Sequence, residues 1–444
     1  MCQIIGRKQE IAELKRAYES GRADIVMMRL VYLIALLSCC SDLFSGEYRC
    51  LSETASAFTR TDEPVKKVIG LMLEQLDKHH SFSYEEEMVS WMPGESEQDG
   101  KTLRRHTLEI VDRQEPYVGA SYVMKGDGHG FFAYDGKKRV RDTEAPMVFE
   151  VDSLFRGITA YRVVTRPFFQ VANTIGQYIL STSDSIHLEM HETAQEYLIK
   201  VSIFTDEQVE FTMGRLTPYI PEVPEAGLFF TPPHVYILHV DKGTYMPIRY
   251  HRILDHNSSM VQVSHVEYDT QRLEDFDIYS YLPPHFTFSK PEAKGVVKAK
   301  LRRGDLAPDF ELRDTEGRTH TLSQYRGKTV LVEFTSVACS VCQIVPAFLH
   351  QLSVEFPQLQ ILSIEAWNMK ASTCLNWVKR KGVTHPYLLD GKSTHAIYTD
   401  NAGVPSFFII DAEGKIAAEF TGYSEQTSPS AIREEIAKYV QISR

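Results

Sequence analysis

The most constraining feature of the sequence is a pair of cysteines, Cys339 and Cys342, that follows a short apolar run. The run, Thr329 to Phe334, has the length of one buried strand, and Glu333 is its only charged residue. After the cysteines, apolar residues recur with the spacing of a helix face packed on a sheet: Val345, Phe348, Leu349, Leu352 and Phe356. A strand that leads into Cys-x-x-Cys at the start of a helix places the first sulfur at the positive end of the helix dipole, so the Cys339 thiol should ionise more easily.

Several further phrases surround the cysteines in a fixed order. They are Ala307 to Leu312, the turn Thr315 to Arg318, Leu322 to Lys328, Gly403 to Asp411, and Gly414-Lys415. This order resembles the TlpA/ResA-like thioredoxin family over nearly all of residues 301–444. The resemblance implies an α/β thioredoxin fold for the C-terminal domain and the activity of a redoxin, a thiol-disulfide oxidoreductase.

The resemblance also implies a role for each site residue. The Cys339 thiolate would attack a substrate disulfide, and Cys342 would then displace the substrate and close the intramolecular disulfide. Glu333 occupies the place of the buried acidic residue of thioredoxins and would accept the Cys342 proton, unless it is a strand-edge glutamate facing solvent. Val404-Pro405 matches the family's cis-proline turn, in which the Val404 backbone pairs with an incoming peptide; an ordinary trans proline is the alternative.

Some positions depart from the family pattern. Thr335 and Ala338 stand where tryptophans are common, and Pro346 lies four residues after the second cysteine instead of five. Ser340 and Val341, between the cysteines, lack the proline that is often found there. These differences bear on substrate fit, on a kink in the helix and on the redox potential.

Length and charge limit the remaining possibilities. A chain of 444 residues is too long for one ordinary core, so two or three folded units are expected. The formal charge of −11 would repel a phosphate backbone, so we expect no nucleic-acid partner. The seven cysteines fall near the two ends of the chain, which argues against a disulfide-stapled scaffold and gives each thiol its own role.

The N-terminal region carries a targeting pattern. Met28-Arg29 is followed by eight apolar residues, 30–37, and then by Ser38-Cys39, which resembles a bacterial lipoprotein signal peptide. Eight residues are far short of the ~20 needed to span a bilayer, so we expect lipidation at Cys39 to anchor the chain. Residues 4–24 resemble the opening of an AAA-type ATPase, but no phosphate-binding loop follows them. Translation is therefore expected to begin at Met27 or Met28, the alternative being a genuine amphipathic N-terminal helix.

The middle of the chain has the pattern of a β-rich domain. An apolar stripe after Asp62 predicts one amphipathic helix, and from Ser81 to Phe288 short, partly alternating runs are separated by turns such as Asp135-Gly136. One helix followed by an antiparallel meander predicts a half-barrel-like sheet with one packed helix. The phrases Tyr134 to Lys138 and Asp241 to Arg249 resemble the LolA-type lipoprotein-binding fold. The alternative is a spacer that holds the redox domain off the membrane.

These patterns divide the chain into four segments. Residues 1–50 form an N-terminal extension with the lipoprotein signal, and residues 51–288 form the β-rich LolA-like domain. Residues 289–297, which are polar and contain proline and glycine, form a linker. Residues 298–444 form the thioredoxin-like domain.

Metal and cofactor sites are not expected. His187, Glu189 and His191 would point to one side of a strand, but half-exposed strands often carry such residues with nothing bound. A structural zinc would need more ligands near the Cys-x-x-Cys than scattered histidines and the unpaired Cys374 provide. Cys374 itself is most simply a buried small hydrophobic residue.

The leading hypothesis is therefore a periplasmic, lipid-anchored thiol-disulfide oxidoreductase of the cell envelope. It would reduce protein disulfides through Cys339 and Cys342, with electrons from a membrane partner. One alternative is a peroxiredoxin-like peroxide reductase, for which Ser336 fits the motif and Val332, standing where a proline is needed, does not. The other is a non-enzymatic module that binds a metal or a lipid.

Overall fold

The computed structural model describes residues 59–60, 62–126, 130–142, 148–153, 163–205, 209–215, 233–289, 301–400, 403–425 and 427–440. The predicted lipoprotein signal with Cys39, and residues 290–297 of the predicted linker, lie outside the described residues. Within these ranges, no helix is both long enough and apolar enough to cross a membrane.

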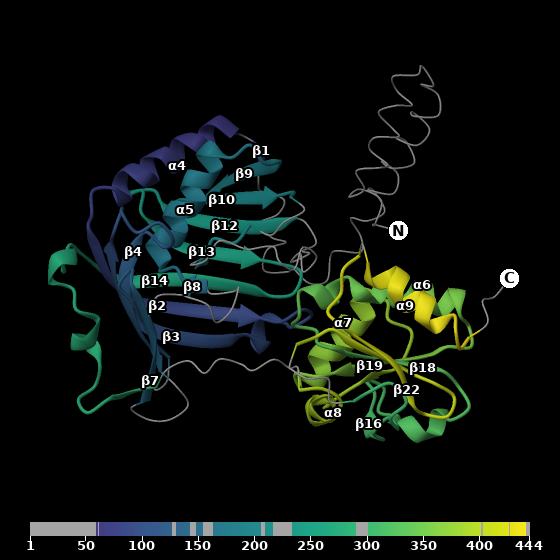
Figure 1. The fold of residues 1–444 in the computed structure, drawn as a ribbon. Helices are drawn as coiled ribbons and strands as arrows, with labels where there is room; N and C mark the ends of the chain where they lie inside the picture. The colour runs from purple at the N-terminus through teal and green to yellow at the C-terminus, as the bar shows by residue number, and fades with distance from the viewer. Residues whose placement is uncertain are drawn as a thin grey trace, which may run out of the picture. The chain divides into compact units, whose positions relative to one another are not determined.

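A large sheet dominates residues 59–289 (Figure 1). Among the described residues, thirteen strands pair in the order β1-β9-β10-β12-β13-β14-β2-β3-β4-β5-β6-β7-β15. Their bounds are β1 Thr59–Arg60, β2 Ser81–Trp91, β3 Lys101–Val111, β4 Ala120–Gly126, β5 Phe131–Tyr134, β6 Lys138–Asp142, β7 Val148–Ser153, β9 Ile186–Glu192, β10 Glu196–Ile203, β12 His234–Asp241, β13 Pro247–Ile253, β14 Ser258–Tyr268 and β15 Thr287–Ser289. Two meanders, β2 to β7 and β9 to β14, are joined where β14 pairs with β2, and this confirms the predicted large antiparallel sheet. The β7–β15 pair is parallel.

Smaller elements complete this part of the chain. The strands β8 (Val163–Thr165) and β11 (Met213–Arg215) form a separate pair, and the short 3₁₀ turns are η2 (Glu97–Asp99), η3 (Leu273–Asp275) and η4 (Ile278–Tyr281). The predicted turn at Asp135-Gly136 connects β5 to β6: Gly136 has φ +77°, and the Asp135 N–H donates to the Lys138 carbonyl at 3.2 Å.

Two helices pack on the sheet, whereas the sequence predicted one. The helix α4 (Asp62–Leu76) is the predicted helix, and α5 (Phe168–Ser181) lies inside the segment that was expected to be a meander. Apolar residues of both helices and of the central strands share one buried core. A Cβ on Gly176 would lie 3.0 Å from the side chains of Met72 and Leu73, so the glycine allows α5 to approach α4 closely. The aromatic and β-branched residues of α5 favour strands by composition, and packing against α4 outweighs that preference.

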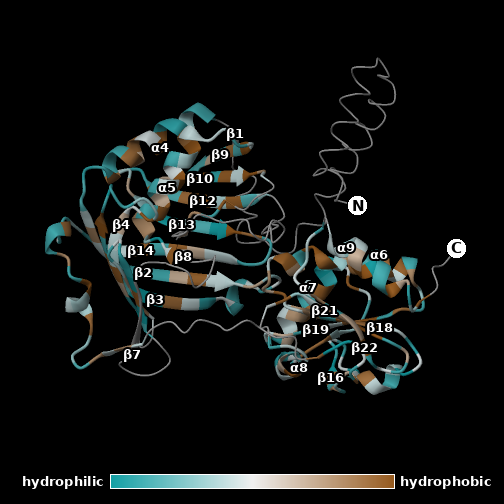
Figure 2. Cartoon of the chain, viewed as in Figure 1, coloured by the Kyte–Doolittle hydropathy of each residue, from teal (hydrophilic) through white to brown (hydrophobic). Residues whose placement is uncertain are grey.

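Residues 301–440 form the predicted α/β domain around a five-stranded sheet (Figures 1 and 2). The strand order is β20-β19-β18-β21-β22, with β18 in the centre. The strands are β18 Val330–Thr335, β19 Gln360–Glu365, β20 Tyr387–Leu388, β21 Ser406–Ile410 and β22 Ile416–Thr421, and a hairpin of β16 Glu311–Arg313 and β17 Thr319–Thr321 precedes them. The helices are α6 Val345–Glu355, α7 Ala371–Lys381, α8 Lys392–Tyr398 and α9 Ser428–Ile436, with 3₁₀ turns η5 Leu322–Tyr325 and η6 Val341–Gln343.

The two faces of this sheet have separate cores. Leu331 of β18 packs with residues of α6 and α9, such as Val345 and Ile432. Its neighbours Val330 and Val332 pack on the opposite side, in a core with residues of α8 and η5. Since side chains alternate along a strand, Glu333 lies on the same face as Leu331, toward α6 and the turn that precedes it.

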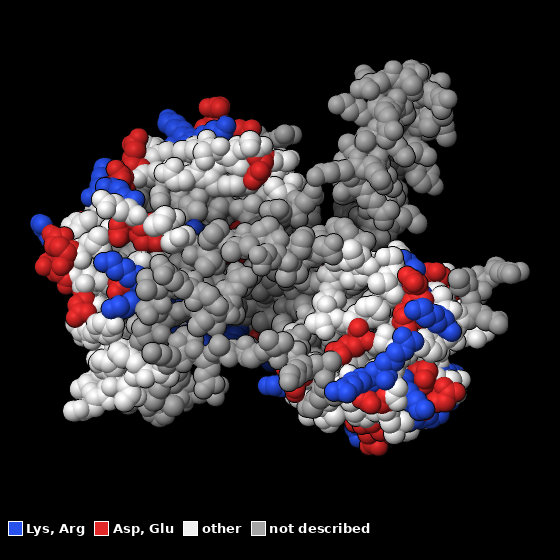
Figure 3. All heavy atoms as spheres, viewed as in Figure 1, with Lys and Arg blue, Asp and Glu red and all other residues white. Residues whose placement is uncertain are grey.

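The surface carries charges of both signs. On the face that Figure 3 draws, lysine and arginine side chains are interspersed with aspartate and glutamate over the described residues. The formal charge of the whole chain is −11.

Candidate active site

Cys339 and Cys342 form a disulfide in the turn between β18 and α6. Their Cα atoms are 5.2 Å apart, and both side chains are buried: Cys339 is 6% exposed and Cys342 is fully enclosed. The Cys342 N–H donates to Cys339 Sγ at 3.2 Å. Cys342 therefore lies beneath Cys339, which is the sulfur closer to the surface.

The helix after the cysteines differs from the sequence prediction. Cys342 lies in the 3₁₀ turn η6, and the regular helix α6 begins only at Val345. Pro346 has no N–H, so it cannot donate to the Cys342 carbonyl four residues earlier. The departure of Pro346 from the family pattern thus places the second cysteine in a short turn ahead of the helix.

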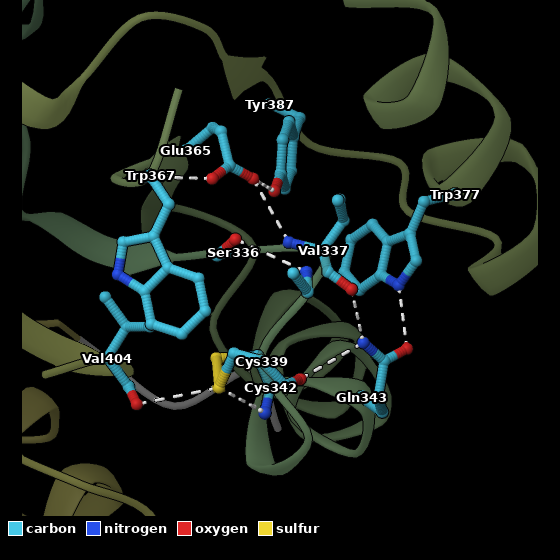
Figure 4. The surroundings of a disulfide bond; sticks show 11 residues. Ser336, Val337, Cys339, Cys342, Gln343, Glu365, Trp367, Trp377, Tyr387 and Val404 are labelled. Carbon is cyan, nitrogen blue, oxygen red and sulfur yellow. Dashed lines mark hydrogen bonds between the residues drawn. A yellow bond between two sulfur atoms is a disulfide. The ribbon is translucent and has the colours of Figure 1, made fainter. Parts of the chain in front are cut away.

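The segment before β21 lies against the disulfide. The Val404–Pro405 peptide bond is cis, and the Val404 carbonyl oxygen is 3.6 Å from Cys339 Sγ. Figure 4 shows this carbonyl pointing at the sulfur pair. The predicted site residues Cys339, Cys342, Val404 and Pro405 are therefore brought together.

A buried glutamine holds the cysteine loop from the helix side (Figure 4). Gln343 Nε2 donates to the carbonyls of Val337, at 2.8 Å, and Cys339, at 3.1 Å. Trp377 Nε1 of α7 donates to Gln343 Oε1 at 2.8 Å. The Gln343 amide nitrogen and oxygen and the Trp377 indole nitrogen therefore all have hydrogen-bond partners. This network holds the loop in one conformation before a substrate binds.

A buried carboxylate holds the same loop from the sheet side (Figure 4). Glu365, at the end of β19, has no exposed surface. Its Oε2 accepts from the Val337 N–H at 3.1 Å and from the Tyr387 hydroxyl at 2.8 Å, and its Oε1 accepts from the Trp367 N–H at 2.9 Å. Burial, and then the charge of Glu365, raise the pKa of Tyr387 well above its ordinary value, so the hydroxyl remains a donor.

The predicted acid, Glu333, is buried in the central strand. It is 3% exposed, which excludes the alternative of a strand-edge glutamate facing solvent. Burial raises the pKa of Glu333 to about 7, although a hydrogen bond from Ser363 Oγ opposes this shift and the nearby Glu365 adds to it. Such a pKa suits a group that accepts and releases a proton near neutral pH.

Ser363 links Glu333 to a histidine. The Ser363 hydroxyl lies 2.8 Å from His385 Nε2, and Ser363 is opposite Glu333 in the β18–β19 register. His385 is half-buried, and burial lowers its pKa to about 4, so the imidazole is neutral at pH 7.

Cys374 has the structural role that the sequence predicted. It is a free, fully buried thiol in α7 and packs with Val337, Trp377 and Tyr387. Burial, and then the charge of Glu365, raise its pKa far above that of an ordinary thiol. Reactive cysteines have lowered pKa values, so Cys374 is not built for exchange.

A tryptophan from another loop lies beside the disulfide. Trp367, which follows β19, is 43% exposed, and Figure 4 shows its ring next to Val404 above the sulfur atoms. Ala338 and Thr335 stand where the resemblance to the thioredoxin family led us to expect tryptophans. Trp367 thus provides an aromatic surface at the site from a different element.

Ser363, Glu365, Trp367 and His385 also belong to the site, as does the Gln343–Trp377 pair, and none of them was predicted from the sequence. One signal was available: Glu365 follows the mostly apolar segment Ile361 to Ile364, and Glu333 lies within its own apolar run. A charged residue in a buried strand is unusual enough to mark a site. No comparable signal marks His385.

His187, Glu189 and His191, the three residues considered in the sequence as possible metal ligands, lie on β9. Among the residues that the structure describes, no group of three or more histidine, cysteine, aspartate or glutamate side chains could hold a metal ion. Glu189 instead forms an ion pair with Lys200 Nζ at 2.7 Å.

Comparisons with known proteins agree with this geometry. Residues 303–419 match the family model described as the AhpC/TSA family. The thiol-disulfide oxidoreductase ResA of Geobacillus thermodenitrificans is 30% identical over 127 residues, which are 28% of this chain and 72% of that protein. ResA of Bacillus subtilis is 28% identical over 127 residues, 28% of this chain and 70% of that protein.

Solved structures are similar in the same region. The thioredoxin domain of a thiol-disulfide oxidoreductase from Bacteroides vulgatus is 21% identical, with a TM-score of 0.27, and the match covers 30% of this chain and 97% of that domain. The predictions of a thioredoxin fold and of an oxidoreductase are confirmed by the ResA relatives. Through its C-terminal domain, the chain belongs to the ResA family of thiol-disulfide oxidoreductases.

Proposed function

We propose that the chain reduces disulfide bonds in protein substrates at the outer side of a bacterial membrane. The observation that carries the proposal is the Cys339–Cys342 disulfide next to the Val404 carbonyl. The carbonyl marks the backbone edge to which an extended peptide would bind, so a substrate disulfide would be delivered to Cys339.

The exchange has two steps. The Cys339 thiolate attacks one sulfur of the substrate disulfide, which forms a mixed disulfide and releases the other substrate sulfur as a thiolate. Cys342 then loses its proton to Glu333 and attacks Cys339 Sγ, which releases the second substrate sulfur. The substrate gains two electrons and the enzyme ends with the Cys339–Cys342 disulfide, which a donor dithiol must reduce again.

The face of the sheet on which Glu333 lies supports its role as the proton acceptor. Glu333 lies on the α6 side of β18, one alternation beyond Leu331, which contacts α6. Cys342 lies in the turn directly before α6. The carboxylate and the buried thiol therefore lie on the same side of the sheet, near the same end of β18.

The location and the role of the β-rich part are further elements of the proposal. The pattern around Cys39 supports a lipid anchor, and the donor would then be a membrane protein. The sheet of residues 59–289, with α4 and α5 on one face, would serve as a LolA-like module that binds a substrate or positions the redox domain. Cys39→Ser should move the full-length protein from the membrane fraction to the soluble fraction, and a protein that stays in the membrane fraction would contradict the anchor.

The redox potential tests the enzymatic proposal. The full chain would be equilibrated in glutathione buffers, and the free thiols of Cys339 and Cys342 trapped by alkylation and counted by mass spectrometry. A value near thioredoxin's, about −270 mV, supports a reductase, and one near about −120 mV indicates an oxidase. If Cys339 instead reduced hydrogen peroxide and did not reduce protein disulfides, a peroxide reductase would be the better assignment.

A further inference from the structure

A continuous chain of hydrogen-bonding groups leads from Glu333 to the surface. Ser363 Oγ is hydrogen-bonded to Glu333 Oε2, and Ser363 Oγ also lies 2.8 Å from His385 Nε2. The Ser363 N–H donates to the carbonyl of Pro386 at 3.1 Å, which fixes the segment carrying His385 beside β19. Glu333 and Ser363 are buried, whereas His385 is half-buried.

The mechanism requires such a chain. If Glu333 takes the Cys342 proton, it must pass that proton to water before the next turnover. Cys342 has no exposed surface and Glu333 is 3% exposed, so water does not reach either group directly. We propose that Ser363 and His385 form a proton relay between Glu333 and solvent, an assignment that rests on the proposed role of Glu333 in the exchange.

The proton transfers balance without a charged intermediate on the histidine. Protonated Glu333 donates its proton to Ser363 Oγ, Ser363 passes its own hydroxyl proton to His385 Nε2, and the imidazole releases its Nδ1 proton to water. Glu333 is then a carboxylate that accepts from Ser363, and His385 has changed from the Nδ1–H to the Nε2–H tautomer. When the enzyme is reduced again, the proton travels inward and the tautomer is restored.

The neutral imidazole is consistent with this route. Burial lowers the pKa of His385 to about 4, so a relay that formed an imidazolium would be costly at pH 7. Exchange between two neutral tautomers avoids that cost, since one ring nitrogen gains a proton as the other loses one.

Other titratable groups around Glu333 do not provide an equivalent route. Glu365 on β19 raises the pKa of Glu333 by its charge, and its own oxygens are engaged by Val337, Tyr387 and Trp367. Burial raises the pKa values of Tyr387, on β20, and Tyr423, which follows β22, far above neutral. Both phenols therefore stay protonated during turnover.

Rapid mixing of the reduced full chain with a chromogenic aromatic disulfide separates the two exchange steps. The first coloured thiolate is released when Cys339 attacks, and the second when Cys342 closes the disulfide. General acid–base catalysis contributes about 10²–10⁴-fold to such steps. We expect Ser363→Ala and His385→Gln each to slow the second phase about tenfold at pH 7 and to leave the first phase within about twofold.

Two measurements separate a relay from a structural effect. Imidazole added to the buffer should restore the second phase of His385→Gln, because a dissolved base can accept the proton, whereas misfolding is not repaired in this way. His350→Gln, a matched substitution of an exposed histidine on α6, should behave as wild type. The relay is wrong if both relay variants close the disulfide at the wild-type rate while Glu333→Gln is slowed. If wild type shows no second phase, the exchange mechanism itself fails.

Discussion

The carboxylate of Glu365 accepts a hydrogen bond from the Val337 N–H at 3.1 Å, and this bond ties the end of β19 to the loop that carries Cys339. Gln343 Nε2 donates to the carbonyls of Val337 and Cys339 in the same loop. The cysteine loop is thus fixed on both sides by side chains that are themselves buried. Fixed geometry of this kind lets exchange proceed without reorganising the loop.

Glu365→Gln should loosen the loop. A glutamine places an NH₂ group where the carboxylate accepts from Val337 and Tyr387, or from Trp367, so at least one buried donor loses its acceptor. An unsatisfied buried donor costs about 1–3 kcal/mol. Hydrogen exchange of peptides covering β18 and β19 should show faster exchange in the variant. Glu311→Gln, at an exposed glutamate, is the control and should match wild type. Equal protection in both variants would mean that Glu365 does not stabilise the loop.

Trp367→Ala should lower kcat/KM for protein substrates. The indole is 43% exposed beside Val404 and offers apolar area to a bound peptide. Losing such a contact typically costs about 1 kcal/mol or more, which corresponds to about a fivefold lower kcat/KM. The change should appear mainly in KM with a denatured, disulfide-bonded protein substrate.

A small aliphatic disulfide provides the comparison for Trp367. It has no aromatic or extended surface to pack on the indole, so the Trp367→Ala variant and wild type should reduce it at the same rate. Val354→Ala, which truncates an exposed apolar side chain at the far end of α6, should affect neither substrate. An equal loss with both substrates would mean that Trp367 supports the cysteines and not the peptide.

Tyr84→Phe should destabilise the β-rich part near α5. The Tyr84 hydroxyl donates to Glu109 Oε2 at 2.9 Å and accepts from the Phe168 N–H at 3.0 Å, so it joins the first residue of α5 to the sheet. Removing it leaves both buried groups with one partner fewer, at a cost of about 1–3 kcal/mol. Hydrogen exchange in residues 168–181 should accelerate, while Tyr117→Phe, at an exposed tyrosine, should leave it unchanged.

Local patterns predicted much of the C-terminal site. The strand, the cysteine pair and the following apolar stripe are close in sequence, so their arrangement could be predicted without knowing the sheet. Glu333 could be identified because it interrupts an apolar run. The short turn that carries Cys342 could not, although Pro346 was visible, because its effect depends on where the helix begins.

Long-range contacts explain what the sequence did not show. Ser363 faces Glu333 only through the pairing register of β18 and β19, and His385 reaches Ser363 only because β20 lies at the edge beside β19. A single sequence carries no such register. The helix α5 was missed for a similar reason, since its partner α4 lies about a hundred residues earlier in the chain.

The raised pKa of Glu333 should make the stability of the C-terminal domain fall with pH. The pKa of Glu333 is about 7 in the folded protein and 4.5 for an ordinary glutamate, so folding favours the protonated form. The stabilisation is fully present below about pH 4.5 and is lost as the pH rises through about 7, a total of about 3 kcal/mol.

Glu333→Gln lacks this titration. The free energy of unfolding of wild type minus that of the variant, both oxidised, should therefore drop by about 3 kcal/mol between about pH 5 and pH 9. The difference is measured by urea unfolding at each pH, with hydrogen exchange of peptides that cover β18 as the readout. Glu311→Gln is the control. Parallel curves for wild type and Glu333→Gln would mean that Glu333 keeps an ordinary pKa and cannot accept the Cys342 proton near neutral pH.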